Sequence, residues 1–96
     1  MMVKEVRPNM PVEEIRLTID ELGEVRTFIT KWGGEGRVRD AAARDEKGDR
    51  VKVSLWNDEV DMVEAGQRVV VRNGYAKVWN GEIQISAGRY GTIKVE

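Results

Sequence analysis

The sequence predicts an all-β domain, a five-stranded barrel with one short helix between its third and fourth strands. Three observations favour this fold class. Apolar and polar residues alternate along residues 14–20 and 51–56, which is the period of a strand with one buried face. Asn80 and Gly81 form a strong two-residue hairpin signal between two strand-like segments. A short helical pattern, residues 58–65, is followed at once by a glycine, the usual residue at a helix end.

The first strand is expected to be long and bent. Residues 14–20 place isoleucine and leucine on one face and polar residues on the other. Gly23 permits a bulge or bend, and residues 25–31 continue in an extended pattern. The glycine-rich residues 32–36 then interrupt the strand, so we expect a flexible loop there.

Residues 37–44 are predicted to form the second strand, although the alanine run 41–43 has a poor strand propensity. Residues 45–49 have the composition of a turn. Residues 51–56 give the clearest strand pattern in the chain, with valine and leucine on one face and lysine, serine and tryptophan on the other.

The second half of the chain begins with the short helix, residues 58–65, which Asn57 or Asp58 is able to cap. A valine-rich strand over residues 68–79 and a return strand over residues 82–86 follow it. Residues 92–95 extend the last strand or pair with another one. This order of strands and helix is that of the OB-fold.

One domain accounts for the whole sequence. A chain of 96 residues suits a single compact core. We assign residues 13–96 to a single OB-fold domain and residues 1–12 to an N-terminal extension.

The composition argues against an enzyme. The chain contains no cysteine and no histidine, which removes disulfides, thiolate nucleophiles, zinc-finger spacings and the commonest general base. We find no phosphate-gripping glycine loop and predict no cofactor. The carboxylates Asp58, Glu59 and Asp61 lack the spacing of a calcium loop, so we predict no metal site.

The sequence contains neither a membrane-spanning apolar run nor a secretory signal at its N-terminus, and a cytoplasmic location is expected. The net charge is -1, which weakens a nucleic-acid-binding interpretation without excluding it, because the local field matters more to a phosphate than the sum.

Three aromatic residues stand out as candidate binding residues. Trp56 shares the polar face of its strand, where a large apolar ring calls for a partner; the alternative is that it covers an end of the barrel. Tyr75 and Trp79 lie four residues apart on one strand, about 13 Å apart on the same face, with Lys77 between them. This arrangement suits bases stacked on the rings and a cation on the intervening phosphate. Both aromatics packed inward is the alternative.

Trp32 stands at the mouth of the glycine-rich loop, where it is placed either to close over a base or to anchor its own loop. The acidic helix, including Asp58 and Glu64, is expected on the far side, away from phosphate. Any single cation in a chain this highly charged is also explained as solvated surface. The candidate groove cations are Lys31, Arg37, Arg39, Lys52, Arg72, Lys77 and Arg89.

An ordered set of segments resembles a known family. It comprises Asp45-Glu46-Lys47-Gly48, the strand ending Ser54-Leu55-Trp56, Gly66, Asn73-Gly74-Tyr75-Ala76, and residues 81–89. The set is similar to the simple single-OB single-stranded DNA-binding proteins of archaea and their eukaryotic relatives, and to the OB repeats of archaeal replication protein A.

The resemblance implies single-stranded DNA binding by base stacking, with the family's stacking aromatics falling on Trp56, Tyr75 and Trp79. A fourth family aromatic would fall on Ser86, so that contact is expected to be absent. Members of the family also carry a C-terminal tail for partner proteins, and this chain stops at Glu96 without one. Either the tail has been removed or the chain is one OB unit of a longer protein.

The function expected from these observations is sequence-tolerant binding of single-stranded DNA that protects single strands in replication, repair or recombination. Two alternatives stay open. One is an RNA-binding OB module of the anticodon-binding type, since stacking serves both nucleic acids. The other is a protein-interaction OB domain of a replication complex, in which a peptide occupies the aromatic face. Single-stranded DNA, single-stranded RNA and replication or repair proteins are therefore the partners considered.

Overall fold

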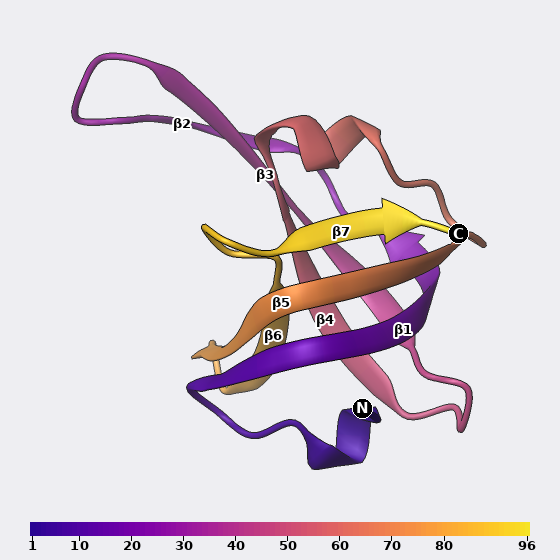
Figure 1. The fold of residues 1–96 in the computed structure, drawn as a ribbon. Coiled ribbons are helices and arrows are strands. Elements are labelled where there is room, and N and C mark those ends of the chain that lie inside the picture. Colours follow the sequence, from indigo (N-terminus) through magenta and orange to yellow (C-terminus); the bar gives the residue numbers. More distant parts are fainter.

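The computed structural model describes residues 1–96, and its ordered elements are almost all strands (Figure 1). The strands are β1 (Met10–Leu22), β2 (Arg26–Ile29), β3 (Glu35–Arg44), β4 (Arg50–Trp56), β5 (Arg68–Trp79), β6 (Glu82–Ser86) and β7 (Thr92–Val95). Two 3-10 helices, η1 (Val3–Glu5) and η2 (Asn57–Asp61), complete the list. None of the helical segments has the length and apolar character that crossing a membrane requires.

Five strands close into a barrel, which confirms the predicted architecture. Neighbouring strands pair in the order β1, β3, β4, β6 and β5, and β5 pairs back onto β1. The β4–β6 pairing is parallel and the others are antiparallel. β2 pairs antiparallel with the first part of β3, from Glu35 to Val38, and β7 pairs antiparallel with β5. The ring leaves few strand edges open, which is how a small all-β domain limits unwanted pairing.

β1 pairs with two different strands and so closes the barrel. It pairs with β5 from Met10 to Thr18 and with β3 from Thr18 to Leu22. The register shifts between Ile19 and Glu21, where a bulge bends the strand. The bend was expected, but the strand is shorter than predicted. It ends at Leu22, because Gly23 leaves the ladder and its N–H donates to the Asp40 carbonyl at 2.8 Å.

β2 is consequently a separate strand that forms a hairpin with β3, and this hairpin projects from the barrel at the upper left of Figure 1. The alanine run in β3 is a strand despite its propensity, because Ala41 and Ala43 face the core and are fully buried there. Small side chains suit the interior where β3 lies between β1 and β4.

The helix predicted over residues 58–65 is shorter and of a different type. η2 is a five-residue 3-10 helix, and the Met62 N–H donates to the Glu59 carbonyl at 3.2 Å. Val60 and Val63, three residues apart, are both buried against the barrel. A 3-10 turn brings residues at i and i+3 onto one face, so burial of these two valines needs no α-helix.

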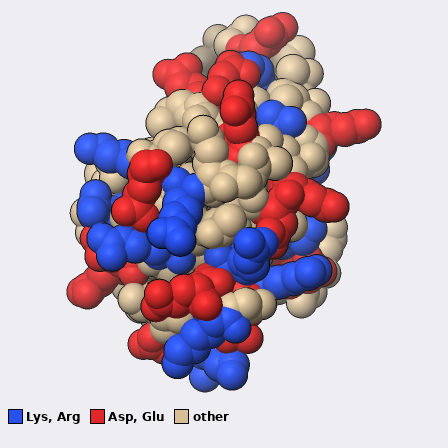
Figure 2. Space-filling view, turned by 90° about the vertical axis from the view of Figure 1, so that its right-hand side faces the viewer, with Lys and Arg blue, Asp and Glu red and all other residues tan.

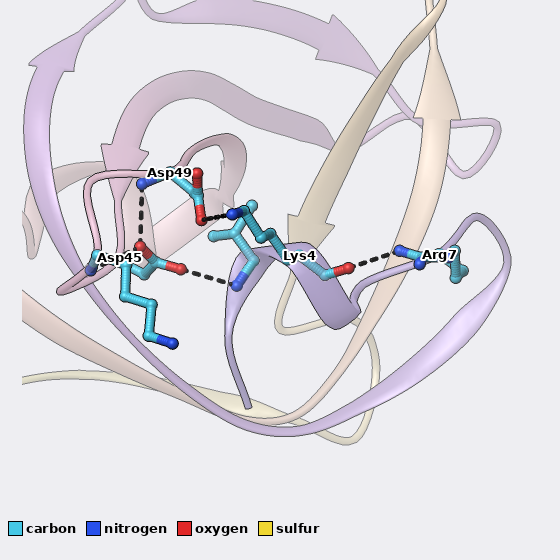
Figure 3. A network of polar contacts seen from close by, with 6 residues as sticks. Lys4, Arg7, Asp45 and Asp49 are labelled. Carbon is cyan, nitrogen blue, oxygen red and sulfur yellow. Dashed lines mark hydrogen bonds and ion pairs between the residues drawn. The ribbon is translucent and has the colours of Figure 1, made fainter.

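Residues 1–12, predicted as an N-terminal extension, pack on the barrel, and β1 already begins at Met10. Val6 and Val12 are both buried in the core cluster. Asp45 in the β3–β4 turn joins this segment to the barrel, because its carboxylate accepts hydrogen bonds from the backbone N–H groups of Val3 at 2.9 Å and of Lys47 and Asp49 at 3.0 Å each (Figure 3). Burial raises the pKa of Asp45, but these three donors outweigh it, and the pKa lies below its ordinary value.

The core is entirely aliphatic. Its largest fully buried side chains are isoleucine, leucine and valine, and no aromatic residue is buried. All six aromatic residues of the chain have more than a third of their surface exposed. Since tryptophan and phenylalanine are costly to leave in water, their position outside the core directs attention to the surface that they form.

Candidate nucleic-acid interface

An open groove of about 1380 Å³ runs across the outer face of β3, β4, β5 and β6. Its walls also include residues of β2 and of the β6–β7 loop. Five of the six aromatic residues line it, namely Phe28, Trp56, Tyr75, Trp79 and Tyr90. The barrel therefore gathers on one side the rings that it excludes from its core.

Trp56 stands at the end of β4, opposite Val38 of β3, with 43% of its surface exposed. The ring of Phe28 meets it edge to face, with the centroids 5.8 Å apart and the planes at 76°. Phe28 lies over Gly36 in the β2–β3 pairing, and any side chain on Gly36 would overlap the phenyl ring. The backbone N–H of Trp56 donates to Glu59 Oε1 at 3.0 Å. Phe28 thus contacts the ring of Trp56, and Glu59 holds its backbone.

Tyr75, Lys77 and Trp79 point outward at alternate positions of β5, as the sequence pattern predicts, and all three line the groove. The hairpin at Asn80 and Gly81 is also confirmed: Trp79 pairs with Glu82, and the two turn residues have φ of 51° and 77°. Two positive φ angles are what a type I′ turn requires. This tight turn holds Trp79 at the end of the hairpin, where 56% of its surface is exposed.

Of the predicted groove cations, Lys77 and Arg89 line the groove. Lys31 and Lys52 lie outside it. Acidic and basic side chains are interspersed on the face of the molecule that Figure 2 displays. Three cations line the groove, namely Arg26, Lys77 and Arg89.

The remaining predicted cations hold loops and strands together. Arg37 pairs with Asp61 at 2.8 Å, and that hydrogen bond raises the pKa of the arginine further. Arg72 pairs with Glu14 of β1 at 2.7 Å. Arg39 donates from Nε to the carbonyl of Gly23 at 2.7 Å and from Nη1 to that of Val60 at 3.4 Å. None of these three arginines lines the groove.

Trp32 does not join the other rings. It lies in the β2–β3 loop with 87% of its surface exposed, outside the groove, and Lys31 Nζ lies 5.9 Å from its ring centroid. The sequence placed it at the mouth of this loop, and the hairpin carries it away from the barrel (Figure 1). It is therefore an exposed tryptophan against which the groove tryptophans can be compared.

Residues 28–95 match the family described as single-stranded DNA binding protein Ssb-like, OB fold. The chain belongs to this family. The Ssb single-stranded DNA binding protein of Saccharolobus solfataricus is 31% identical over 86 residues, which cover 90% of this chain and 57% of that protein. The Ssb-like chain thus spans little more than half the length of this relative. The resemblance to archaeal single-OB proteins is confirmed.

Solved structures support the fold of the Ssb-like chain. The second OB-fold domain of replication protein A from Methanococcus maripaludis superposes with a TM-score of 0.77 at 24% identity, over 99% of this chain and 92% of that one. An OB domain from Thermoplasma acidophilum gives 0.78 at 15% identity, over 100% and 85%. A hypothetical protein from Arabidopsis thaliana gives 0.79 at 17% identity, over 100% and 72%.

The groove residues of the Ssb-like domain that sequence reasoning missed include Phe28, Tyr90, Arg26 and Asp40. Phe28 was read only as part of the first strand, and its role depends on β2 folding back beside β3. Tyr90 directly follows the predicted cation Arg89 in a glycine-punctuated loop, a signal that would have identified it. Arg26 lies 3.3 Å from Asp40 at the groove wall.

The expectation that the acidic segment lies on the far side is wrong for Glu59, which lines the groove together with Asn57. Its carboxylate folds back to accept a hydrogen bond from the backbone N–H of Trp56. Burial raises the pKa of Glu59, and the hydrogen bond from Trp56 offsets this only in part. The groove therefore contains acids as well as cations, and its attraction for a ligand rests on the rings.

Proposed function

We propose that this domain binds single-stranded DNA by stacking bases on the rings of the groove. One observation carries the proposal: the core contains no aromatic residue, whereas five of the six aromatics line a single groove. A surface that keeps its largest apolar groups in water needs a ligand with flat apolar faces, and unpaired bases supply them.

The energetics favour stacking over ion pairing. Each base stacked on an aromatic ring contributes roughly 1–3 kcal/mol, and every base offers a similar face, so stacking tolerates any sequence. Trp56, Tyr75 and Trp79 provide the main platforms, with Phe28 supporting Trp56. Lys77 lies between two of these rings along β5. In the proposed complex it contacts the phosphate that links neighbouring bases.

The proposed role is protection of single strands during replication, repair or recombination, by a binding protein without catalytic activity. The names of the relatives support it: one is a single-stranded DNA binding protein and another is a domain of replication protein A. RNA is the ligand to be separated from DNA, because only contacts to the 2′-hydroxyl distinguish the two.

The test compares two exposed tryptophans. Trp79→Ala removes a ring from the groove, and Trp32→Ala removes one outside it, so the second is a matched control for the loss of an exposed indole. Binding of labelled oligo-dT, oligo-rU and duplex DNA is measured by fluorescence anisotropy at two salt concentrations. We expect Trp79→Ala to weaken oligo-dT binding about 5- to 150-fold and Trp32→Ala to change it less than about twofold.

Three results would contradict the proposal. Equal losses in the two variants would place the site elsewhere, and tighter binding of oligo-rU than of oligo-dT would make RNA the ligand. Absence of binding to any oligonucleotide would favour a peptide as the occupant of the groove.

A further inference from the structure

The floor of the groove between the rings is polar and contains a carboxylate. Asp40 of β3 lies opposite Ser54 of β4, Ser54 lies beside Ser86 of β6, and Ser86 lies opposite Tyr75 of β5. All four residues line the groove. Trp56 lies two residues from Ser54 along β4, on the same face and about 7 Å away. If a base stacks on the side of Trp56 that faces this row, its edge is directed toward Asp40 and Ser54.

Asp40 retains acceptor capacity for a ligand. A carboxylate offers about four lone-pair positions. Its two contacts are long: Arg26 Nη2 lies 3.3 Å from Oδ2, and Ser54 Oγ lies 3.5 Å from Oδ1. The single hydroxyl proton of Ser54 has a closer acceptor, Gln84 Oε1 at 2.8 Å. The Gln84 oxygen is thereby engaged, which leaves its NH₂ group available as a donor beside the Asp40 acceptor.

A phosphate is a poor ligand for this floor, because the Asp40 carboxylate repels it. A base edge that carries N–H groups fits instead. Guanine has two adjacent donors, N1–H and the N2 amino group, which match the two oxygens of one carboxylate. Its O6 then accepts from an amide such as that of Gln84. Adenine and cytosine present one amino group on this edge, and thymine presents one imide N–H.

We propose that Asp40 gives the groove a preference for guanine at the nucleotide stacked on Trp56. The inference rests on the proposed binding of single-stranded DNA and adds base selectivity at one position to it. Asp40 acts as a selectivity residue, while the rings supply most of the affinity.

The experiment removes one donor from the base. Short oligo-dT strands carrying one central guanine or one central inosine are titrated against the protein, because inosine lacks only the N2 amino group. We expect the guanine strand to bind at least about fivefold more tightly than the inosine strand, the lower end of what a bidentate base contact discriminates. In Asp40→Asn, whose amide has only one acceptor oxygen, the ratio should fall to about one.

Glu46→Gln is the matched control. It removes a carboxylate from the exposed β3–β4 turn, outside the groove, and should leave the guanine-to-inosine ratio unchanged. A wild-type ratio near one overturns the guanine inference without any variant, and the proposed function stands if oligo-dT still binds. A ratio that persists in Asp40→Asn also overturns it, because guanine is then read elsewhere. Failure of every strand to bind overturns the proposed function itself, and the inference with it.

Discussion

Truncation of Trp56 to alanine is expected to weaken DNA binding strongly while leaving the domain folded. The ring offers one stacking platform, worth roughly 1–3 kcal/mol, so affinity for oligo-dT should fall about 5- to 150-fold. The stability cost follows from burial. A tryptophan carries roughly 250 Å² of surface, and with 43% exposed, about 140 Å² of it is buried here. At roughly 25 cal/mol/Å² this contributes at most about 3.5 kcal/mol, part of which alanine retains.

We therefore expect Trp56→Ala to lose about 2 kcal/mol of folding free energy, which lowers the Tm by roughly 8–16 °C in a domain of this size. Anisotropy with labelled oligo-dT measures the affinity, and thermal unfolding followed by circular dichroism measures the stability. Phe28→Ala removes the edge contact to Trp56 but keeps its indole, so its binding loss should be the smaller of the two. The reasoning is refuted if Trp56→Ala folds and binds within about twofold of wild type, or if it does not fold at all.

Three further outcomes are expected. The log–log salt slope for oligo-dT should lie at roughly -1.5 to -3, and Lys77→Ala should make it shallower by about 0.7, because each phosphate contact to a single strand contributes about that much; a slope near zero would point to a protein partner. Asp45→Ala should cost about 2–3 kcal/mol in denaturant unfolding, because three backbone donors lose their acceptor. The folded-state pKa of Asp45 is lowered, so the Asp45 carboxylate should stabilise the folded domain fully at pH values above its ordinary pKa of 3.8. This stabilisation should disappear as the pH falls through the folded-state pKa. Glu59→Gln should unfold at a higher temperature than wild type at pH 7 but not at pH 4. Burial raises the pKa of Glu59, so the stabilisation of the folded domain by the protonated side chain is present at pH values below the ordinary pKa of 4.5. That stabilisation is lost as the pH rises through the folded-state pKa. An equal difference at both pH values would contradict this.

The main platforms of the candidate site were predictable because they depend on local alternation. In β5, side chains at alternate positions share a face whatever the strand pairs with, so Tyr75, Lys77 and Trp79 had to point the same way. Trp56 followed from the same rule in β4. The cations were harder to predict, because an arginine reaches several ångströms and its direction depends on its partner. Arg37 reaches Asp61 across 24 residues of sequence, and no periodicity encodes that contact.

The sequence by itself determined most of the strands, the hairpin turn and the order that closes the barrel strands into an OB barrel, whereas it merged β1 and β2 into one strand. Period-two patterning and a turn with two positive φ angles are local properties, and each is written within a few residues. Only the tertiary structure decided which rings share the groove, because that depends on pairings between distant segments. The β2–β3 register sets Phe28 over Gly36 and against Trp56, whereas the same hairpin carries Trp32 away. The row from Asp40 to Tyr75 likewise exists only once four strands lie side by side.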